Sequence, residues 1–328
     1  MRAINVLLVV AFVILTVSVG MPVMSGTETL PARQVAGQVR SFHVESPRPL
    51  SHGWSEVYSF PGAKFLRLHF QGFDLAEGDK VIVSSVSGTQ AWEYTGRGVN
   101  KDGDFWSFAV DGDAVKVEVQ ATSGRSSGFR IVDVGYGTVD LGGSAPSPRV
   151  IVDTDGREDV ACHAEDPVVA VTQPPVARLL FQDKKQLYLC TGELIRGFNA
   201  NTLITNAHCI DSQTVVDTLE ARFNYQYTTC GGTELEESQS FAGSTFLLSN
   251  SERYHRRKAN TGLDYALLTL NGNAEAIFGE LVPTTASIDV GTTMNFIQHG
   301  AGNPKQIGWW EDAAHSVRCH VATVSQTY

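Results

Sequence analysis

Short segments in which apolar and polar residues alternate recur along this 328-residue chain, and they constrain its fold more than any other feature. Alternation with a period of two is typical of strands with one buried face, whereas helices repeat their apolar positions every three or four residues. Such segments occur between residues 40 and 140, at 63–70, 80–85, 104–110, 114–119 and 129–134. Residues 159–328 contain further short predicted strands at 176–181, 187–190, 202–205 and 265–270. Because several follow one another with no helix between them, we expect an all-β protein.

A stretch rich in Gly, Ser and Pro, residues 141–158, is predicted to be a linker between two domains. Residues 40–140 are predicted to form an N-terminal β-sandwich or jelly roll, in which Asp111-Gly112-Asp113 is the turn of a hairpin. Residues 159–328 form the second predicted domain. Residues 27–39 are predicted to be a disordered lead.

Residues 1–26 are typical of a secretory signal peptide. Arg2 supplies a positive charge, and the apolar run from Val6 to Val17 is interrupted only by Thr16. This run is shorter than the ~20 residues that a membrane-spanning helix needs, so we favour cleavage between residues 20 and 26 over anchoring. We therefore expect a secreted, extracellular protein with no membrane attachment after cleavage.

Charge and cysteine content narrow the choice of partners. The formal net charge of −10 repels phosphate backbones, so no nucleic-acid partner is expected. In an exported protein, cysteines are expected to form disulfides, and an odd number leaves one thiol without a partner. All of them lie within residues 159–328, the second predicted domain: Cys162, Cys190, Cys209, Cys230 and Cys319.

Two residues of the second domain have the pattern of a general base and the carboxylate that orients it. His208 follows an apolar strand in the segment Thr205-Asn206-Ala207-His208-Cys209, and Asp264 begins another apolar strand. A buried carboxylate is costly unless it is paired, so we expect Asp264 to accept a hydrogen bond from the His208 imidazole. A disulfide between Cys190 and Cys209 would also restrain the loop that holds His208, and closing a loop of that size stabilises by ~3 kcal/mol in the chain-entropy model.

The segment around His208 resembles the Thr-Ala-Ala-His-Cys signature of trypsin-like serine proteases. The wider region resembles their lysyl endopeptidase branch in residues 159–162, 223–230, 263–268 and 296–307. This resemblance implies an incomplete chymotrypsin-like double β-barrel and a catalytic pair of His208 and Asp264. It also implies two disulfides, Cys162–Cys230 and Cys190–Cys209. The sandwich region resembles the CUB-like segment that precedes the protease in related secreted proteins.

The resemblance ends before the nucleophile. The family motif Gly-x-Ser-Gly-Ser/Gly-Pro is absent, and none of the serines after Asp264, which are Ser287, Ser316 and Ser325, has a flanking glycine that could present oxyanion-hole amides. We therefore interpret residues 159–328 as a protease domain truncated before its serine. On this interpretation the partner of Cys319 lies in missing C-terminal sequence. His299 is interpreted as structural or as an edge of the substrate site.

These features predict a secreted serine-type endopeptidase that acts on protein or peptide substrates and needs no cofactor. This chain is interpreted as a fragment of that enzyme without the serine. One alternative is a secreted binding protein, a protease homologue that kept the scaffold and lost catalysis. In another, residues 40–140 are a carbohydrate- or protein-binding module, in which Trp92, Tyr94 and Trp106 would form a sugar-stacking platform, although packing is the commoner role of such residues. No metal site is expected, because His315, Cys319 and His320 lack a fourth ligand at a finger-like spacing.

Overall fold

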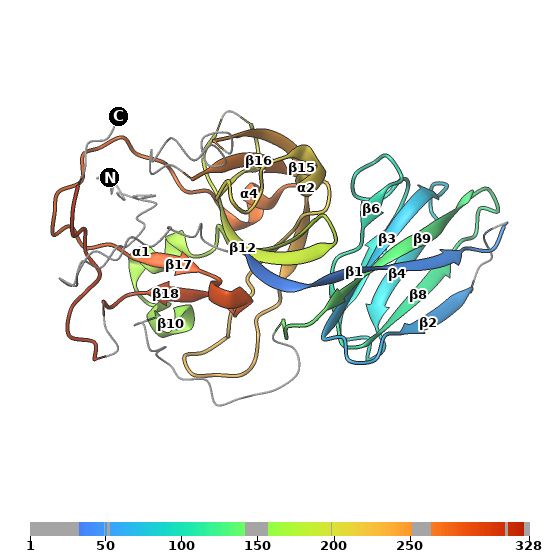
Figure 1. The fold of residues 1–328 in the computed structure, drawn as a ribbon, viewed down its shortest axis with the longest axis horizontal. Helices are drawn as coiled ribbons and strands as arrows, with labels where there is room; N and C mark the ends of the chain where they lie inside the picture. The colour runs from blue at the N-terminus through green and yellow to red at the C-terminus, as the bar shows by residue number, and fades with distance from the viewer. Residues whose placement is uncertain are drawn as a thin grey trace, which may run out of the picture.

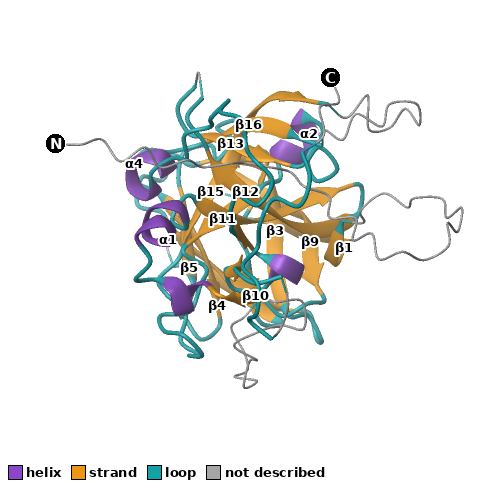
Figure 2. Ribbon diagram, turned by 90° about the vertical axis from the view of Figure 1, so that its left-hand side faces the viewer, coloured by secondary structure: helices purple, strands orange, loops and turns teal. Residues whose placement is uncertain are grey.

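The computed structural model describes residues 33–48, 50, 53–141, 157–197, 199–250, 264–311 and 314–324. In these residues strands predominate and lie side by side in a sandwich and a barrel (Figure 1), which confirms the all-β expectation. The short helices lie around the strands (Figure 2). No helix of the described part of the chain is long and apolar enough to cross a membrane. The predicted signal peptide and most of the predicted linker lie outside the described residues.

The sandwich consists of two antiparallel sheets, one with the order β1-β9-β3-β6 and β7 beside β3, the other with the order β2-β8-β4-β5. In β8, for example, Val115, Val117 and Val119 are fully buried while the residues between them are partly exposed. The apolar sides of both sheets thus share one core. The strands are β1 (Gln34–Glu45), β2 (Ser55–Ser59), β3 (Phe65–Asp74), β4 (Lys80–Ser85), β5 (Ala91–Tyr94), β6 (Phe105–Trp106), β7 (Val110–Asp111), β8 (Ala114–Gln120) and β9 (Gly128–Gly137).

The hairpin predicted around Gly112 is wrong. β7 pairs with β3, whereas β8 pairs with β2 and β4, so the turn between β7 and β8 carries the chain from one sheet to the other. Gly112 has a φ of 104°, a value that favours glycine and that lets the chain make this crossing. The local sequence of a turn does not distinguish a hairpin from such a crossover, because only the packing of the two sheets selects the partner strand.

The sandwich tryptophans and Tyr94 belong to the interior. Tyr94 and Trp106 are buried, and the Trp92 Nε1–H donates a hydrogen bond to the Ala109 carbonyl at 3.0 Å. The Tyr94 hydroxyl accepts a hydrogen bond from the Phe108 N–H at 2.7 Å. The alternative of an exposed aromatic platform formed by these rings is therefore wrong.

Six strands of the second domain form a closed barrel in the order β11-β14-β15-β16-β13-β12, which the pairing of β12 with β11 completes. Closure leaves no free edge within this barrel, and apolar side chains fill its interior. The strands are β11 (Val176–Asp183), β12 (Gln186–Leu194), β13 (Thr202–Thr205), β14 (Glu220–Phe223), β15 (Gln239–Ser249) and β16 (Ala266–Leu270).

A separate three-stranded sheet, with the order β10-β18-β17, lies beside the barrel. It is all that the described residues contain of a second barrel, in agreement with the predicted incomplete double barrel. The predicted linker 141–158 ends too late, because its last two residues already belong to β10. The remaining elements are β10 (Arg157–Asp159), α1 (Pro167–Thr172), α2 (Gln213–Val216), α4 (Ala274–Phe278), β17 (Phe296–Gln298), β18 (Gln306–Gly308) and the 3-10 turns η1 (Val160–His163) and η2 (Gly300–Gly302).

β1 belongs to both domains. Its residues 34–38 pair with residues 186–189 of β12, and from Gly37 onward it pairs with β9, so β1 runs from the barrel into the sandwich (Figure 1). At the point of exchange a Cβ on Gly37 would lie 2.2 Å from the Tyr136 carbonyl oxygen, so the close approach requires glycine. The disordered lead predicted for residues 27–39 is therefore wrong from Gln34 onward, because tertiary pairing orders a segment with little local strand signal.

A buried charged network joins the sandwich to the barrel. Glu220 of β14 is bound by Arg222 Nη2 at 2.8 Å and accepts a hydrogen bond from the Ala109 N–H of the sandwich at 2.8 Å. Arg67 of β3 lies 4.0 Å from the same carboxylate and donates to the Ser107 carbonyl at 2.8 Å. Burial by itself would raise the pKa of Glu220, but Arg222 and Arg67 outweigh it and lower that pKa, so the group is ionised. A buried charge with this many partners fixes how the two domains meet.

Removal of the Glu220 charge is expected to destabilise the protein strongly. In Glu220→Gln, Arg67 and Arg222 would remain buried without the carboxylate that they share, and removal of one partner of a buried ion pair typically costs ~3–5 kcal/mol. The matched substitution Glu93→Gln removes an exposed ion pair with Lys80 and should cost no more than about 1 kcal/mol. Urea denaturation of both variants checks this expectation, and equal shifts of their midpoints would contradict it.

His69 forms a second polar cluster on the sandwich. Its Nε2 lies 2.6 Å from an Asp104 carboxylate oxygen and its Nδ1 lies 3.2 Å from Asp133, while its ring stacks on Trp106 at 4.8 Å. Burial alone would lower the pKa of His69, but the hydrogen bonds and charges of Asp104 and Asp133 outweigh it, and the pKa is raised. The protonated imidazole is thus the form that this cluster stabilises.

The raised pKa of His69 predicts a pH-dependent contribution to stability. Its contribution should be fully present below the unfolded-state pKa of about 6.5 and should be lost as the pH rises through the higher folded-state pKa. The stability difference between wild type and His69→Gln should therefore shrink as the pH is raised through that window. Urea midpoints measured across pH check this, with His43→Gln, at an exposed position, as the control.

Candidate functional site

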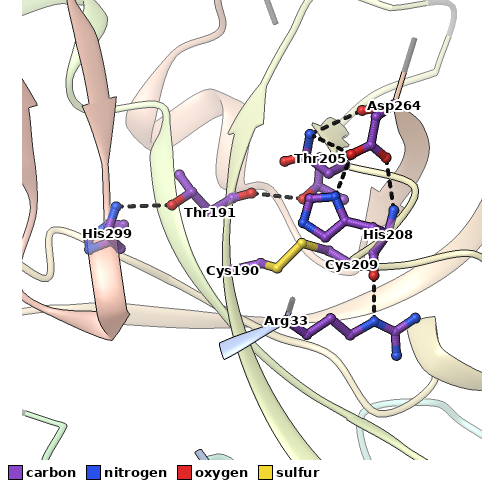
Figure 3. Close-up of a disulfide and its surroundings, with 9 residues drawn as sticks. Arg33, Cys190, Thr191, Thr205, His208, Cys209, Asp264 and His299 are labelled. Carbon is purple, nitrogen blue, oxygen red and sulfur yellow. Dashed lines mark hydrogen bonds and ion pairs between the residues drawn. A yellow bond between two sulfur atoms is a disulfide. The ribbon is translucent and has the colours of Figure 1, made fainter. Parts of the chain in front are cut away.

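Strand pairing explains why His208 and Asp264 meet. β13 and β16 are antiparallel, and their last pair joins Thr205 to Ala266 at one edge of the barrel. His208 lies three residues after Thr205 and Asp264 two residues before Ala266, so both leave the sheet at the same edge. Figure 3 shows the two side chains facing each other there.

The Asp264 carboxylate binds His208 at two points. Oδ1 accepts a hydrogen bond from the His208 backbone N–H at 2.9 Å, and Oδ2 contacts the imidazole Nδ1. The Asn206 side-chain amide donates to the Asp264 carbonyl at 3.0 Å. With only 11% of the Asp264 side chain and 17% of the His208 side chain exposed, water competes little for these contacts. The arrangement fixes both the position and the ring orientation of His208.

The electrostatics of the pair favour an ionised carboxylate. Burial by itself would raise the pKa of Asp264, but the hydrogen bonds and charge of His208 and the backbone N–H of Ala207 outweigh it, and the pKa is lowered. A carboxylate that stays ionised can stabilise a positive charge on the neighbouring imidazole. The pair is therefore suited to accept and release a proton at His208.

Both disulfides implied by the resemblance are present, Cys162–Cys230 and Cys190–Cys209. The second joins β12 to the residue that follows His208 and closes a loop of 19 residues, which supplies ~3 kcal/mol in the chain-entropy model. Cys319 has a free thiol.

Potential metal ligands come together at one place in the described part of the chain. The single group of His, Cys and carboxylate atoms found close enough together there is Cys190, His208 and Cys209, and its sulfurs are joined in a disulfide and cannot act as thiolate ligands. Of the residues weighed as zinc ligands, His320 pairs with Glu311 at 2.6 Å and His315 with Glu158 at 3.2 Å, so these two imidazoles face different carboxylates.

His299 is connected to the site through the backbone. Its N–H donates to the Thr191 hydroxyl at 2.9 Å, and the Thr191 carbonyl accepts from the Thr205 hydroxyl at 2.7 Å (Figure 3). His299 is 3% exposed, and burial together with the charge of Lys305 lowers its pKa well below the usual range. A neutral, enclosed imidazole of this kind suits a structural role.

Two residues at the site were not predicted from the sequence. Asn206 binds Asp264, and the only sequence signal for it is that it replaces the first alanine of the family's Thr-Ala-Ala-His-Cys. Arg33 Nε donates to the His208 carbonyl, although Arg33 lies in the lead that was predicted to be disordered. No local pattern indicates that a residue before the sandwich reaches the barrel.

The serines considered as nucleophiles are poorly placed for that role. Ser287 and Ser316 are exposed, and Ser325 lies outside the described residues. Neither described serine follows a glycine, so neither has the backbone setting that presents an oxyanion hole in this class of enzyme.

Substitution of Asp264 is expected to change how the free energy of unfolding depends on pH in the acid range. Because the pKa of Asp264 is depressed in the folded protein, its ionisation adds stability above the unfolded value of about 4, and this is lost as the pH falls through the lower folded value. Asp264→Asn should therefore cost ~1–3 kcal/mol near neutral pH and progressively less in acid. Urea unfolding across pH tests this against Asp113→Asn, at an exposed position, and a constant difference would contradict it.

Comparison with known proteins identifies relatives of this region. The family model "Lysyl endopeptidase, C-terminal domain" matches residues 154–327. The chain is 26% identical over 266 residues to Secreted RxLR effector protein 73 of Plasmopara viticola, covering 76% of this chain and 63% of that protein. It is 25% identical over 192 residues to a lysyl endopeptidase of Pseudomonas aeruginosa, covering 54% of this chain and 40% of that enzyme. The chain thus spans less than two thirds of either relative.

Solved structures give weaker matches. A Glu endopeptidase in complex with MPD has 20% sequence identity and a TM-score of 0.31, covering 48% of this chain and 68% of that one. The thermostable serine protease AL20 from an extremophilic microorganism has 16% sequence identity and a TM-score of 0.29, and the match covers 38% of this chain and 57% of that one. The family match, by contrast, spans more than half of the 328 residues and includes His208, Asp264 and all five cysteines. The chain belongs to the lysyl endopeptidase C-terminal domain family.

Proposed function

We propose that this protein is a secreted member of the serine endopeptidase class in which His208 is the general base and Asp264 the residue that orients it. The observation that supports this most directly is the double contact of one carboxylate with the His208 ring and backbone N–H. A carboxylate that binds both the imidazole ring and the backbone N–H fixes the position of the ring nitrogen. A general base requires such a fixed ring nitrogen, whereas a surface histidine without a catalytic role does not.

In such chemistry the second ring nitrogen of His208 takes the proton of a serine hydroxyl as that oxygen attacks a peptide carbonyl. Asp264 stabilises the resulting imidazolium and does not itself take up the proton. The 328-residue sequence contains no Gly-x-Ser-Gly segment. We therefore propose that the chain as printed holds the proton-transfer half of the site and does not hydrolyse peptides on its own.

Secretion is part of this proposal. An N-terminal apolar run with a preceding arginine supports export, and two disulfides are typical of proteins that fold in an oxidising compartment. One relative is itself named as a secreted effector. Peptides or proteins are the proposed substrates or targets, as the name of the other relative suggests.

A peptidase assay tests the proposal about activity. Purified residues 27–328 should show no turnover of fluorogenic peptides and no adduct with a fluorophosphonate, because no activated serine is expected. Trypsin under the same conditions is the positive control. Hydrolysis that is lost in His208→Ala would contradict this proposal and would require a nucleophile elsewhere in the chain.

A second candidate function is target binding without cleavage. It is favoured by the absent nucleophile motif together with the match to a secreted effector over a length greater than residues 159–328. Binding of denatured casein, measured without cleavage and weakened by His208→Ala, would support it. Cleavage would contradict it.

A further inference from the structure

The backbone of His208 is held from both sides by residues far apart in the sequence. Asp264 accepts a hydrogen bond from its N–H at 2.9 Å, whereas Arg33 Nε donates to its carbonyl oxygen (Figure 3). The next residue, Cys209, is fixed to Cys190 by a disulfide. Arg33 is thus the one contact in this set that comes from the chain preceding the sandwich.

Strand pairing, an ion pair and a contact with an aromatic ring hold Arg33 in place. Gln34, the next residue, pairs with Leu189 in β12, which places Arg33 beside Cys190 and the His208 loop. Its Nη1 forms an ion pair with Asp183 at the end of β11, and its guanidinium lies 5.2 Å from the Tyr188 ring centre. Only 17% of the Arg33 side chain is exposed, so these contacts are largely protected from solvent.

We infer that Arg33 is a positioning residue for His208, through which the residue immediately before β1 takes part in organising the candidate catalytic pair. This inference rests on the proposed function of His208 as a base. Since Asp183 neutralises much of the charge of Arg33, the effect of Arg33 on the imidazole is chiefly geometric: it fixes the peptide unit from which the side chain projects. Lysine could supply the charge, but its point-like ammonium lacks the planar fork that binds a carbonyl and a carboxylate together.

The test follows the Nδ1 proton of His208 by proton NMR in the full secreted chain. A proton held between an imidazole and a carboxylate resonates far downfield. His208→Ala and Asp264→Asn assign it against the other described His–carboxylate pairs, which are those of His69 with Asp104 and Asp133, His163 and His315 with Glu158, and His320 with Glu311. In Arg33→Met the exchange of this proton with solvent should accelerate about tenfold, the order expected for loss of one charge-assisted hydrogen bond. Arg33→Lys should restore part of the protection.

Arg40→Met is the matched control. Arg40 lies within β1, which Arg33 immediately precedes, and its guanidinium is 3.4 Å from the Tyr136 ring centre. No contact to the His208 loop is expected from this position, where β1 pairs with β9 of the sandwich. Equal acceleration in Arg33→Met and Arg40→Met would overturn the inference, because it would reflect general loosening of β1. Asp183→Asn, which removes the ion-pair partner but no donor to His208, should give a smaller acceleration than Arg33→Met.

The two proposals fail in different ways. If wild type shows no downfield proton that depends on both His208 and Asp264, the proposed catalytic pair is wrong, and the role of Arg33 is wrong with it. If that proton is present and unchanged in Arg33→Met, the pair stands and only the positioning role of Arg33 is wrong.

Discussion

The pairing of β1 with two strands at once is the constraint on which the rest of the structure depends. Because β1 bonds to β9 of the sandwich and β12 of the barrel, ten strands from both domains form one continuous hydrogen-bonded path. The sandwich and the barrel therefore cannot rotate freely about a linker, as two tethered domains would. The buried charges around Glu220 then fix the angle at which the sandwich and the barrel meet, because a change of that angle would separate a buried charged group from its partner.

This arrangement has consequences for the candidate site. His208 lies on a loop between a disulfide, a carboxylate and an arginine, and these come from β12, the start of β16 and the start of β1. A base is effective only when its ring is held in one orientation, and here that restraint comes from segments widely separated in the sequence. The residue that leads into the first strand of the sandwich supplies part of the restraint.

Several features could be predicted from the sequence because they are local. Alternation identified most strands, such as β4 and β8, since a half-buried strand imposes that period on its own residues. The His208 motif and the polar start of the β16 strand identified the candidate pair, because a base and its carboxylate must occupy particular positions at strand ends. The prediction of a hairpin at Gly112 was wrong for the converse reason, since the sequence of a turn does not determine which strand the next strand pairs with.

The sequence by itself determined the all-β class and the family, because both depend on short patterns of residue type. The two disulfides and the candidate pair of His208 and Asp264 followed from the resemblance that those patterns carry. Only the tertiary structure decided that β1 joins the two domains, that Arg67, Glu220 and Arg222 form a buried network, and that Arg33 reaches His208. These contacts join residues far apart in the chain, and their free energy arises from burial and from partners that no local pattern specifies.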